Sequence, residues 1–517
     1  MTMWGDEAGQ KWNDGYVVDT PYTESIFADL NPAMFSMAAV LMGQPPINPS
    51  KPSTWIDLGC GNGLTACMVA AANPNVQVWG CDFNSRHVER AREFASKVGL
   101  DNCRFDEASF ADVAANDHVG PREADVIFAN GVFSWISQQH QRDFTEVVNR
   151  RLRAGGLAYV HSITATGWSA MEPLAEAMRL KVDADVRRAD LAFSDAIAMI
   201  QRLADSGAAY FPVGPRETAT MNSWSRDDPR YAVHEYCTAN FGPLMFDQLA
   251  AAMDTARCSY LGSLESADHL SPQTSTGPAD RSDDIVTRQL IRDLTDGRMA
   301  RKDLFRRGLT TATVVESDDW VRQLCFVGLG KSLDKAPVVD VVNGALTLDA
   351  AFYRPIADAL GEGPLDVDAV RELCPGLSAP DAVAAMAVLV QGGYAAPERP
   401  GWRDTDSGQR CRRMNQVLIA ENRLSASHEY LVTPATGGAV QSEYVEMLCL
   451  GAMWDGVAAN VHAISDEVEQ LMAKSHRLIR EDYRLVTDRS EARLIIEQRV
   501  ERALRRARGV FEQLGIC

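Results

Sequence analysis

The chain has 517 residues, of which 46% are hydrophobic and 23% are charged, a composition that is typical of globular proteins and excludes a disordered or fibrous chain. At roughly 150 residues per domain, this length predicts two to four domains. The 51 Lys and Arg residues against 70 Asp and Glu residues give a net charge of -19. Because nucleic acids and anionic membranes attract basic surfaces, we expect neither of them as a partner.

The 11 cysteines are scattered and form no Cys-x-x-Cys pair, so the sequence predicts no metal site. The first residues contain no basic segment followed by an apolar run, and we therefore expect no signal peptide. The apolar stretch at 32–43 is too short to cross a bilayer. These features favour a cytoplasmic protein.

A glycine-rich loop is the most informative motif. Residues 55–58 form a short apolar run that is typical of a buried parallel strand. Three alternating glycines follow, Gly59, Gly61 and Gly63, and then a helical pattern at 64–72. A strand, a glycine turn and a helix form the start of a nucleotide-type βαβ unit, in which glycines let the backbone approach a ligand closely.

Two cofactors compete for such a loop. The dinucleotide fingerprint is Gly-x-Gly-x-x-Gly with a pyrophosphate on the helix N-terminus, whereas the spacing here is Gly-x-Gly-x-Gly. Asp57, two residues before the first glycine, would repel a pyrophosphate but suits an ammonium group. Asp82, at the end of a second strand at 76–81, is placed to accept hydrogen bonds from ribose hydroxyls. S-adenosylmethionine has an ammonium group and a ribose but no phosphate, so the pattern favours it; the alternative is a tight turn without a ligand.

Further strands are predicted at 103–106, 125–130 and 152–161. The resulting alternation of strands and helices resembles the class I methyltransferase sheet over residues 20 to about 165. Many such methyltransferases carry an acid near the adenine amine. Ser109 follows the third strand at this place and could take that role only more weakly.

Flanking motifs narrow the resemblance. They are Tyr22, Phe27, Leu30-Asn31-Pro32, Asn130-Gly-Val-Phe-Ser-Trp135, Gly167-Trp168, His234-Glu-Tyr236 and Phe241-Gly-Pro. Together they resemble bacterial methyltransferases with a methyltransferase regulatory domain, a group that includes lysine methyltransferases of rickettsial outer-membrane proteins. The resemblance implies N-methylation of protein lysine, with Tyr22 and Asn130 close to the cofactor. The chain departs from the group at Asn130, where relatives more often have His.

The predicted cofactor-binding residues follow from these motifs. They are Tyr22, Asp57, Gly59, Gly61, Gly63, Asp82, Phe83, Ser109, Asn130 and Gly131.

The candidate catalytic residues are Tyr22, Asn130, Trp135 and His234. A lysine has a reference pKa of about 10.4 and must lose a proton before it is methylated, and a desolvated aromatic slot favours the neutral amine. Tyr22, Phe133 and Trp135 are the candidates for its wall, unless Phe133 and Trp135 are core residues.

Two histidines have alternative interpretations. His234, with Glu235 beside it, could relay a proton or bind the acceptor. His161, at the end of the fifth strand, is expected to face the cofactor edge. The alternative for both histidines is a structural role in packing.

We expect a class I, Rossmann-like α/β core with a seven-stranded sheet, an insertion, and a mostly helical C-terminal domain with a winged-helix-like segment. The predicted boundaries are 1–167 and 243–311 for the core, 168–242 for an insertion covering the acceptor site, and 312–517 for a regulatory or interaction domain. A helix at 246–253 and strands at 258–265 and 301–308 would complete the sheet, with an exposed loop at 264–284.

The winged-helix-like segment comprises helices at 366–373 and 379–390 and a turn into a strand at 391–396. The second helix carries Asp381 and no Lys or Arg. Because DNA-reading helices are basic, we favour contact with a protein partner or a second copy over DNA. The tail at 462–517 is expected to form long helices.

Three functions remain open. The first is an S-adenosylmethionine-dependent methyltransferase acting on protein lysine, the second is a methyltransferase of small molecules, and the third is a non-catalytic S-adenosylmethionine-binding scaffold. The intact aspartates and glycines of the loop argue against the scaffold.

Overall fold

A computed structural model describes residues 13–211, 214–269, 284–331, 333, 337–341, 344–424, 428–481 and 484–517. A seven-stranded sheet lies at the centre, in the order β3-β2-β1-β4-β5-β7-β6. Its strands are β1 (Ser53–Leu58), β2 (Val76–Asp82), β3 (Cys103–Glu107), β4 (Ala124–Ala129), β5 (Leu152–Ile163), β6 (Ser259–Ser263) and β7 (Ala300–Arg306). The first five run parallel, and β7 pairs antiparallel with both β5 and β6. This is the class I methyltransferase fold, which the sequence predicted.

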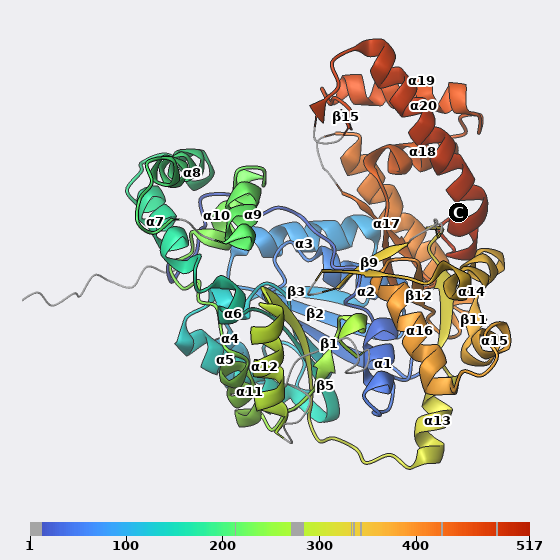
Figure 1. Cartoon of the computed structure of the whole chain (residues 1–517), viewed down its shortest axis with the longest axis horizontal. Coiled ribbons are helices and arrows are strands. Elements are labelled where there is room, and N and C mark those ends of the chain that lie inside the picture. The colour runs from blue at the N-terminus through green and yellow to red at the C-terminus, as the bar shows by residue number, and fades with distance from the viewer. Residues whose placement is uncertain are drawn as a thin grey trace, which may run out of the picture.

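Helices cover both faces of the sheet (Figure 1). They are α1 (Pro32–Leu41), α2 (Leu64–Ala72) and α3 (Ser85–Val98) on one face, and α4 (Phe110–Ala115), α5 (Gln138–Arg151) and α11 (Phe246–Thr255) on the other. Successive strand residues alternate between the two cores: Trp55 and Phe128 pack on the first face, Ile56 and Ile127 on the second. Burial on both faces explains why these strands are continuous apolar runs.

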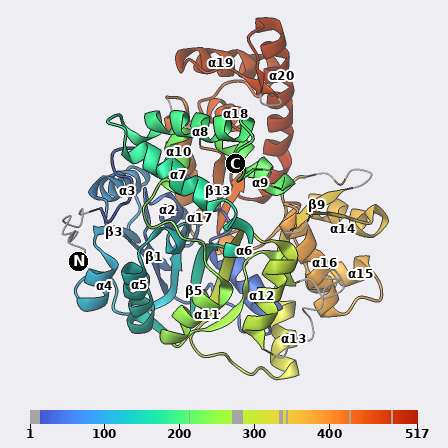
Figure 2. The same ribbon diagram turned by 60° about the vertical axis from the view of Figure 1, so that its left-hand side comes forward.

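The segment between β5 and α11 is helical. It contains α6 (Ala165–Trp168), α7 (Glu172–Asp183), α8 (Ala189–Asp205), α9 (Pro215–Trp224) and α10 (Pro229–Tyr236). These helices share a hydrophobic cluster of their own, which includes Trp168, Phe193 and Trp224. Figures 1 and 2 show α7–α10 gathered in one lobe beside the core.

The sequence after β7 is also mostly helical. Its helices are α13 (Val314–Arg322), α14 (Ala350–Glu362), α15 (Val367–Leu373), α16 (Ala379–Gln391), α17 (Ser407–Asn422), α18 (Tyr444–Trp454), α19 (Val461–Lys474) and α20 (Arg489–Arg506). Short antiparallel strands join them: β8 (Cys325–Gly328) with β11 (Leu365–Asp366) and β12 (Ala395–Pro397), β9 (Val338–Val341) with β10 (Gly344–Thr347), β13 (Tyr430–Thr433) with β14 (Gly438–Gln441), and β15 (Arg480–Glu481) with β16 (Arg484–Leu485).

Helix α16, the second helix of the winged-helix-like segment, is largely buried in a hydrophobic core of the C-terminal region. Most of its residues from Ala379 to Leu389 are buried, and they pack with Phe326 and Tyr394. Pro380 and Asp381, in its first turn, are exposed.

The C-terminal region packs directly on the methyltransferase core. Met414 and Leu418 of α17 belong to the same hydrophobic cluster as α2 and α3. Asn73 Nδ2 donates to the carbonyl of Gly437 at 2.7 Å, and Arg410 pairs with Asp101 at 3.0 Å. The two parts therefore share one continuous core.

The prediction of an exposed loop at 264–284 is wrong for its first residues, which are buried. Leu264 and Ser266 are each 2% exposed. The guanidinium of Arg298 bonds both carboxylate oxygens of Asp268, at 2.7 and 2.8 Å, and holds this segment beside α12 (Ile285–Asp296). Residues 270–283 lie outside the described part of the chain. In that part, we find no helix with the length and apolarity needed to cross a bilayer.

Candidate functional site

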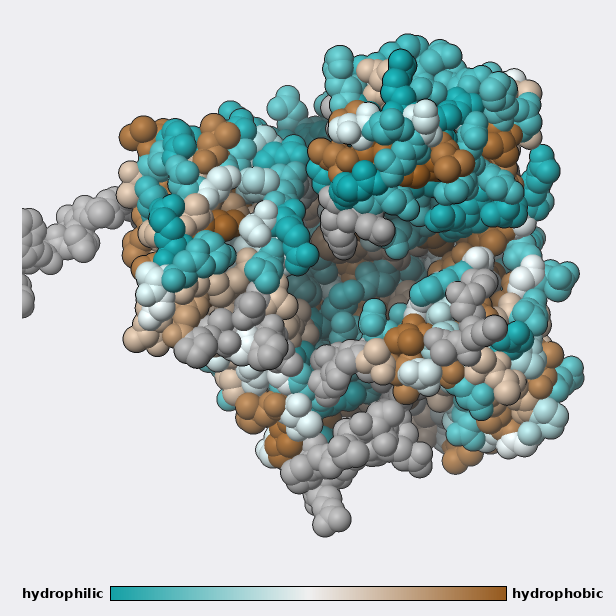
Figure 3. All heavy atoms as spheres, turned by 45° about the horizontal axis from the view of Figure 1, so that its top comes forward, coloured by the Kyte–Doolittle hydropathy of each residue, from teal (hydrophilic) through white to brown (hydrophobic). Residues whose placement is uncertain are grey.

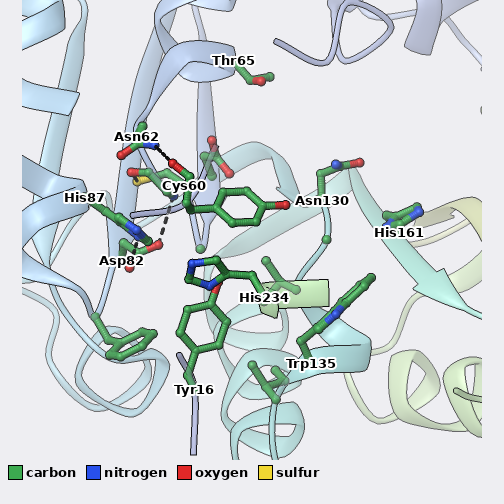
Figure 4. A pocket seen from close by; sticks show the side chains of 18 of the residues that line it. Tyr16, Cys60, Asn62, Thr65, Asp82, His87, Asn130, Trp135, His161 and His234 are labelled. Atoms are coloured by element: carbon green, nitrogen blue, oxygen red, sulfur yellow. Dashed lines mark hydrogen bonds and ion pairs between the residues drawn. The ribbon is translucent and has the colours of Figure 1, made fainter. Parts of the chain in front are cut away.

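A cavity of about 590 Å³ opens where the carboxyl ends of β1, β2 and β4 meet (Figure 4). The strand order reverses between β1 and β4, and in open α/β sheets ligands bind at this point. Residues from the N-terminal segment, the glycine loop, α10 and β7 also line the cavity. The fold therefore brings together motifs that are more than 200 residues apart in the sequence.

The glycine loop has a left-handed backbone at all three of its glycines. Gly59, Gly61 and Gly63 have φ angles of 79°, 51° and 73°. A Cβ at Gly59 would lie 2.6 Å from Val132, and one at Gly63 would lie 2.6 Å from Ala91. Gly61 instead faces open space, so it leaves room on the cavity side of the loop.

Asp82 ties the glycine loop to the next helix. Its Oδ2 accepts the N–H of Gly61 at 3.0 Å, and its Oδ1 accepts the N–H of Asn84 at 2.9 Å. His87 Nδ1 lies 3.3 Å from the same oxygen, Oδ1. Figure 4 shows Asp82 and His87 together at one end of the cavity.

The residues present fit S-adenosylmethionine. Asp57 lines the cavity and is 5% exposed, and burial, followed by the nearby charge of Asp82, raises the pKa of its carboxyl group. An ammonium group beside Asp57 would stabilise the charged carboxylate and so oppose this rise in its pKa. Phe83, Ala108 and Phe110 also line the cavity and supply an apolar surface suited to an adenine ring.

Ser109 and Gly131 line the same cavity. The Ser109 hydroxyl donates to Asp112 Oδ2 at 2.6 Å and accepts the N–H of Asp112 at 3.1 Å. It therefore caps α4, and its hydrogen-bonding capacity toward an adenine amine is reduced. Gly131, with φ of 68°, leaves open space where a side chain would stand.

Tyr22, Glu235 and Trp135 form one connected group in the cavity wall. The Tyr22 hydroxyl donates to Glu235 Oε1 at 3.1 Å, and the Trp135 indole N–H donates to the Glu235 carbonyl at 3.0 Å. Burial raises the pKa of the Glu235 carboxyl to about 7, although the bond from Tyr22 acts in the opposite direction. A carboxyl group with this pKa exchanges protons near neutral pH.

His234 lies in the middle of the cavity view in Figure 4, between Asp82 and Trp135. Its Nε2 is 2.9 Å from the carbonyl of Thr20, which can only accept, so Nε2 carries the proton. Nδ1 has no hydrogen-bond partner among the described residues. Burial lowers the pKa of the ring to about 4, so His234 is neutral at pH 7.

His161 also lines the cavity, where it stacks on Trp135 with ring centroids 6.0 Å apart. Burial, and then the charge of Lys302, lower its pKa to about 4. Both histidines therefore offer neutral rings rather than charges to a bound molecule.

Asn130 is held by a residue that the sequence analysis missed. The Tyr159 hydroxyl on β5 donates to Asn130 Oδ1 at 2.8 Å and so directs the amide N–H₂ away from Tyr159. Tyr16, Tyr231 and Asn240 were missed as well, although all three line the cavity. None of these residues belongs to a local motif, and only the fold brings them to this edge of the sheet.

Phe133 is not part of the cavity wall, which corrects the sequence prediction. It is 1% exposed and packs edge-on against Phe144 of α5, with centroids 5.3 Å apart. Residues 133–135 form a short 3-10 helix, which turns Phe133 into the core and Trp135 toward the cavity. The alternative of core packing was therefore right for Phe133.

Two acidic residues and one histidine lie close together next to the N-terminal segment that lines the cavity. Glu24, Glu421 and His428 approach one another closely enough to hold a metal ion. The Arg90 guanidinium, however, contacts Glu24 and Glu421 at 2.7 Å each. This arrangement is an ion-pair network that joins α3, α17 and the segment after Tyr22.

Comparison with known proteins agrees with this geometry. A family model described as "Methyltransferase domain" matches residues 49–195, and one described as "Predicted methyltransferase regulatory domain" matches residues 228–307. An uncharacterized protein of Synechocystis sp. is 24% identical over 85% of this chain and 87% of its own length.

A trans-aconitate 2-methyltransferase of Methylobacterium radiotolerans is 32% identical, but over only 21% of this chain and 40% of its own length. The solved structure of PKMT2 from Rickettsia typhi in complex with AdoHcy covers 96% of this chain and 99% of its own, with a TM-score of 0.66 and 18% identity. At this identity the likeness supports a shared fold across the core, the insertion and the C-terminal region.

Proposed function

We propose that this chain, an S-adenosylmethionine-dependent class I methyltransferase with a methyltransferase regulatory domain, methylates the side-chain amines of protein lysines. The observation that carries the proposal is Glu235, a partly buried carboxyl group in an aromatic wall of the cavity. A lysine ammonium is attracted both by such a carboxylate and by the faces of aromatic rings. Tyr22, Tyr231 and Trp135 supply these rings.

The residues of the site divide into two groups. Asp57, Asp82 and the glycine loop would hold the cofactor, which when bound supplies an electrophilic methyl group. Glu235 and Tyr22 would bind the acceptor ammonium, and the Glu235 carboxylate would accept its proton, which leaves a neutral amine with a free lone pair. Alignment of that amine can contribute several kcal/mol to catalysis.

The pKa of about 7 suits Glu235 for this proton transfer. General bases work best when their pKa lies near the operating pH, and their contribution is typically 10²–10⁴-fold. His234 and His161 would assist as neutral neighbours, because the added charge of a protonated ring would repel the ammonium.

The surface also supports a macromolecular substrate. Figure 3 shows a hollow between the lobe of α7–α10 and the C-terminal region, with hydrophilic residues on its floor. We further propose that the segment 168–242 covers the acceptor side, since Tyr231, His234 and Glu235 of α10 line the cavity. A contact role for residues 312–517, with a protein or a second copy, remains part of this proposal.

A small molecule is the second candidate acceptor. Lys302 lines the cavity and could bind a carboxylate, the chemistry that a trans-aconitate methyltransferase handles. Asp29 already pairs with Lys302 at 2.6 Å. The likeness to trans-aconitate methyltransferases covers only 21% of the chain. Both observations favour a protein lysine over a small molecule as the methyl acceptor.

The test uses S-adenosylmethionine with a labelled methyl group, a bacterial cell extract as acceptor, and the wild-type protein beside Glu235→Gln. We expect label in protein as methylated lysine after acid hydrolysis, and at least a hundredfold less with the variant. Label confined to small metabolites would reject the lysine proposal. Calorimetry of both proteins with S-adenosylmethionine is the control, because the cofactor should bind each of them equally.

A further inference from the structure

A second cavity lies on the other side of the wall that closes the first. It has a volume of about 440 Å³ and lies between the start of α7 and the turn after α10. The turn at 238–241 separates the two: Asn240 faces the first cavity, while Thr238 and Phe241 face the second. Phe241 packs on Trp135 of the first cavity with ring centroids 5.9 Å apart.

The second cavity contains a buried polar group without a partner. Thr238 is 2% exposed, and its hydroxyl makes no hydrogen bond to any residue in the described part of the chain. An unpaired buried hydroxyl is unfavourable, because it has lost its hydrogen bonds to water and gained none in the protein. A ligand that hydrogen-bonds to Thr238 would recover this cost.

The charges around the second cavity leave one carboxylate available. Arg179 is neutralised by Glu176 at 2.6 Å and by Asp183 at 2.6 Å. Glu172, in the first turn of α7, is exposed and has no cationic partner among the residues that the structure describes. No cation among these residues therefore competes with a ligand for its charge.

Aromatic rings complete the lining. Tyr236 stacks on Trp168 with centroids 5.6 Å apart, and Phe241 packs edge-on against the same indole at 5.4 Å. A carboxylate, a hydroxyl and aromatic faces together are the surroundings that recognise an ammonium or guanidinium group.

We propose that the second cavity binds a basic side chain, Arg or Lys, of the same polypeptide whose lysine occupies the first cavity. This inference rests on the proposed function and adds a sequence preference to it. An extended chain advances about 3.3–3.6 Å per residue, so about two residues span the 5.9 Å between the ring centroids of Trp135 and Phe241. With about one further residue inside each cavity, the basic residue lies within about four positions of the acceptor lysine in the substrate sequence. A net charge of -19 favours such a basic segment.

The test measures binding separately from methylation. Nine-residue Gly/Ser peptides carry a fluorescent label and norleucine at the central, acceptor position, and a single Arg is placed at each other position in turn. The matched peptides have Gln in place of Arg. Fluorescence anisotropy with the full-length protein and S-adenosylhomocysteine gives the affinity of each peptide.

We expect Arg to bind at least tenfold more tightly than Gln at one or two positions. Glu172→Gln and Thr238→Val should each reduce this ratio to below threefold. Asp195→Asn on α8, which removes an exposed carboxylate outside both cavities, should leave the ratio unchanged. Equal melting temperatures and equal cofactor affinities of the variants show that they are folded.

An Arg/Gln ratio near one at every position in the wild type would overturn the inference, and so would a ratio that survives both variants. Peptides with lysine at the central position then test the proposed function. If Arg-containing peptides bind through Glu172 and Thr238 but the lysine is never methylated, the lysine proposal fails while the basic-side-chain site stands.

Discussion

Glu235→Gln keeps the shape of the side chain and removes its charge, so it isolates the contribution of this carboxyl group. Burial raises the pKa of Glu235 from 4.5 to about 7. At about 1.4 kcal/mol per pKa unit, this difference corresponds to ~3 kcal/mol. The folded protein therefore retains the proton up to pH 7, whereas the unfolded chain releases it near pH 4.5.

The direction of the effect follows from proton binding. Between pH 4.5 and 7 the folded state binds more protons than the unfolded state, so the stability of the wild type falls as pH rises through this window. Glutamine does not titrate, and Glu235→Gln escapes this loss. The stability of the variant relative to the wild type should thus grow by up to ~3 kcal/mol between pH 5 and pH 8.

Calorimetric melting of both proteins at pH 5, 6, 7 and 8 measures this change. We expect the difference in melting temperature to widen with pH in favour of the variant, while Asp195→Asn shows no such trend. In methylation assays, kcat/KM of the wild type should rise with pH through about 7, and the variant should lose this rise together with 10²–10⁴-fold in rate. A difference in melting temperature between the two proteins that does not change with pH, or a variant with wild-type kcat/KM, would refute the role given to Glu235.

Three further substitutions test the cofactor site and the core. Asp82→Ala should weaken S-adenosylmethionine affinity at least tenfold in calorimetry, because it removes charged hydrogen bonds; unchanged affinity would place the ribose elsewhere. Tyr159→Phe removes the 2.8 Å bond to Asn130 and should weaken cofactor binding about fivefold, at ~1 kcal/mol for one hydrogen bond; wild-type affinity would show that Asn130 needs no support. Arg301→Ala leaves Asp303, which is 0% exposed and 2.7 Å from the guanidinium, without its partner. Chemical denaturation should show a loss of ~3–5 kcal/mol, and a loss below 1 kcal/mol would contradict the buried pairing.

Much of the fold was predictable because its signals are local. The apolar run of β1, the alternating glycines and the helical pattern of α2 follow one another within 20 residues, and the structure has them at the predicted positions. The strand-end position of Asp82 depends on short-range backbone geometry in the same way.

The prediction for Phe133 failed for a reason that is not local. Phe133 and Trp135 are two aromatic residues of one short segment, and nothing in the sequence tells which of them faces a cavity. The 3-10 turn and the position of Phe144 on α5 decide this. The buried start of the loop at 264–284 is similar, since it depends on the ion pair between Asp268 and Arg298, which lie 30 residues apart.

By itself, the sequence determined the class I core, the S-adenosylmethionine loop and the acidic character of the chain, because each depends on neighbouring residues or on composition. Only the tertiary structure decided the acceptor side. Glu235 meets Tyr22 across 213 residues, Tyr159 of β5 reaches Asn130 at the end of the neighbouring strand β4, and Thr238 faces a second cavity beside the first. Such contacts arise when packing of the core brings distant segments together, and burial then changes the chemistry of the groups that meet there.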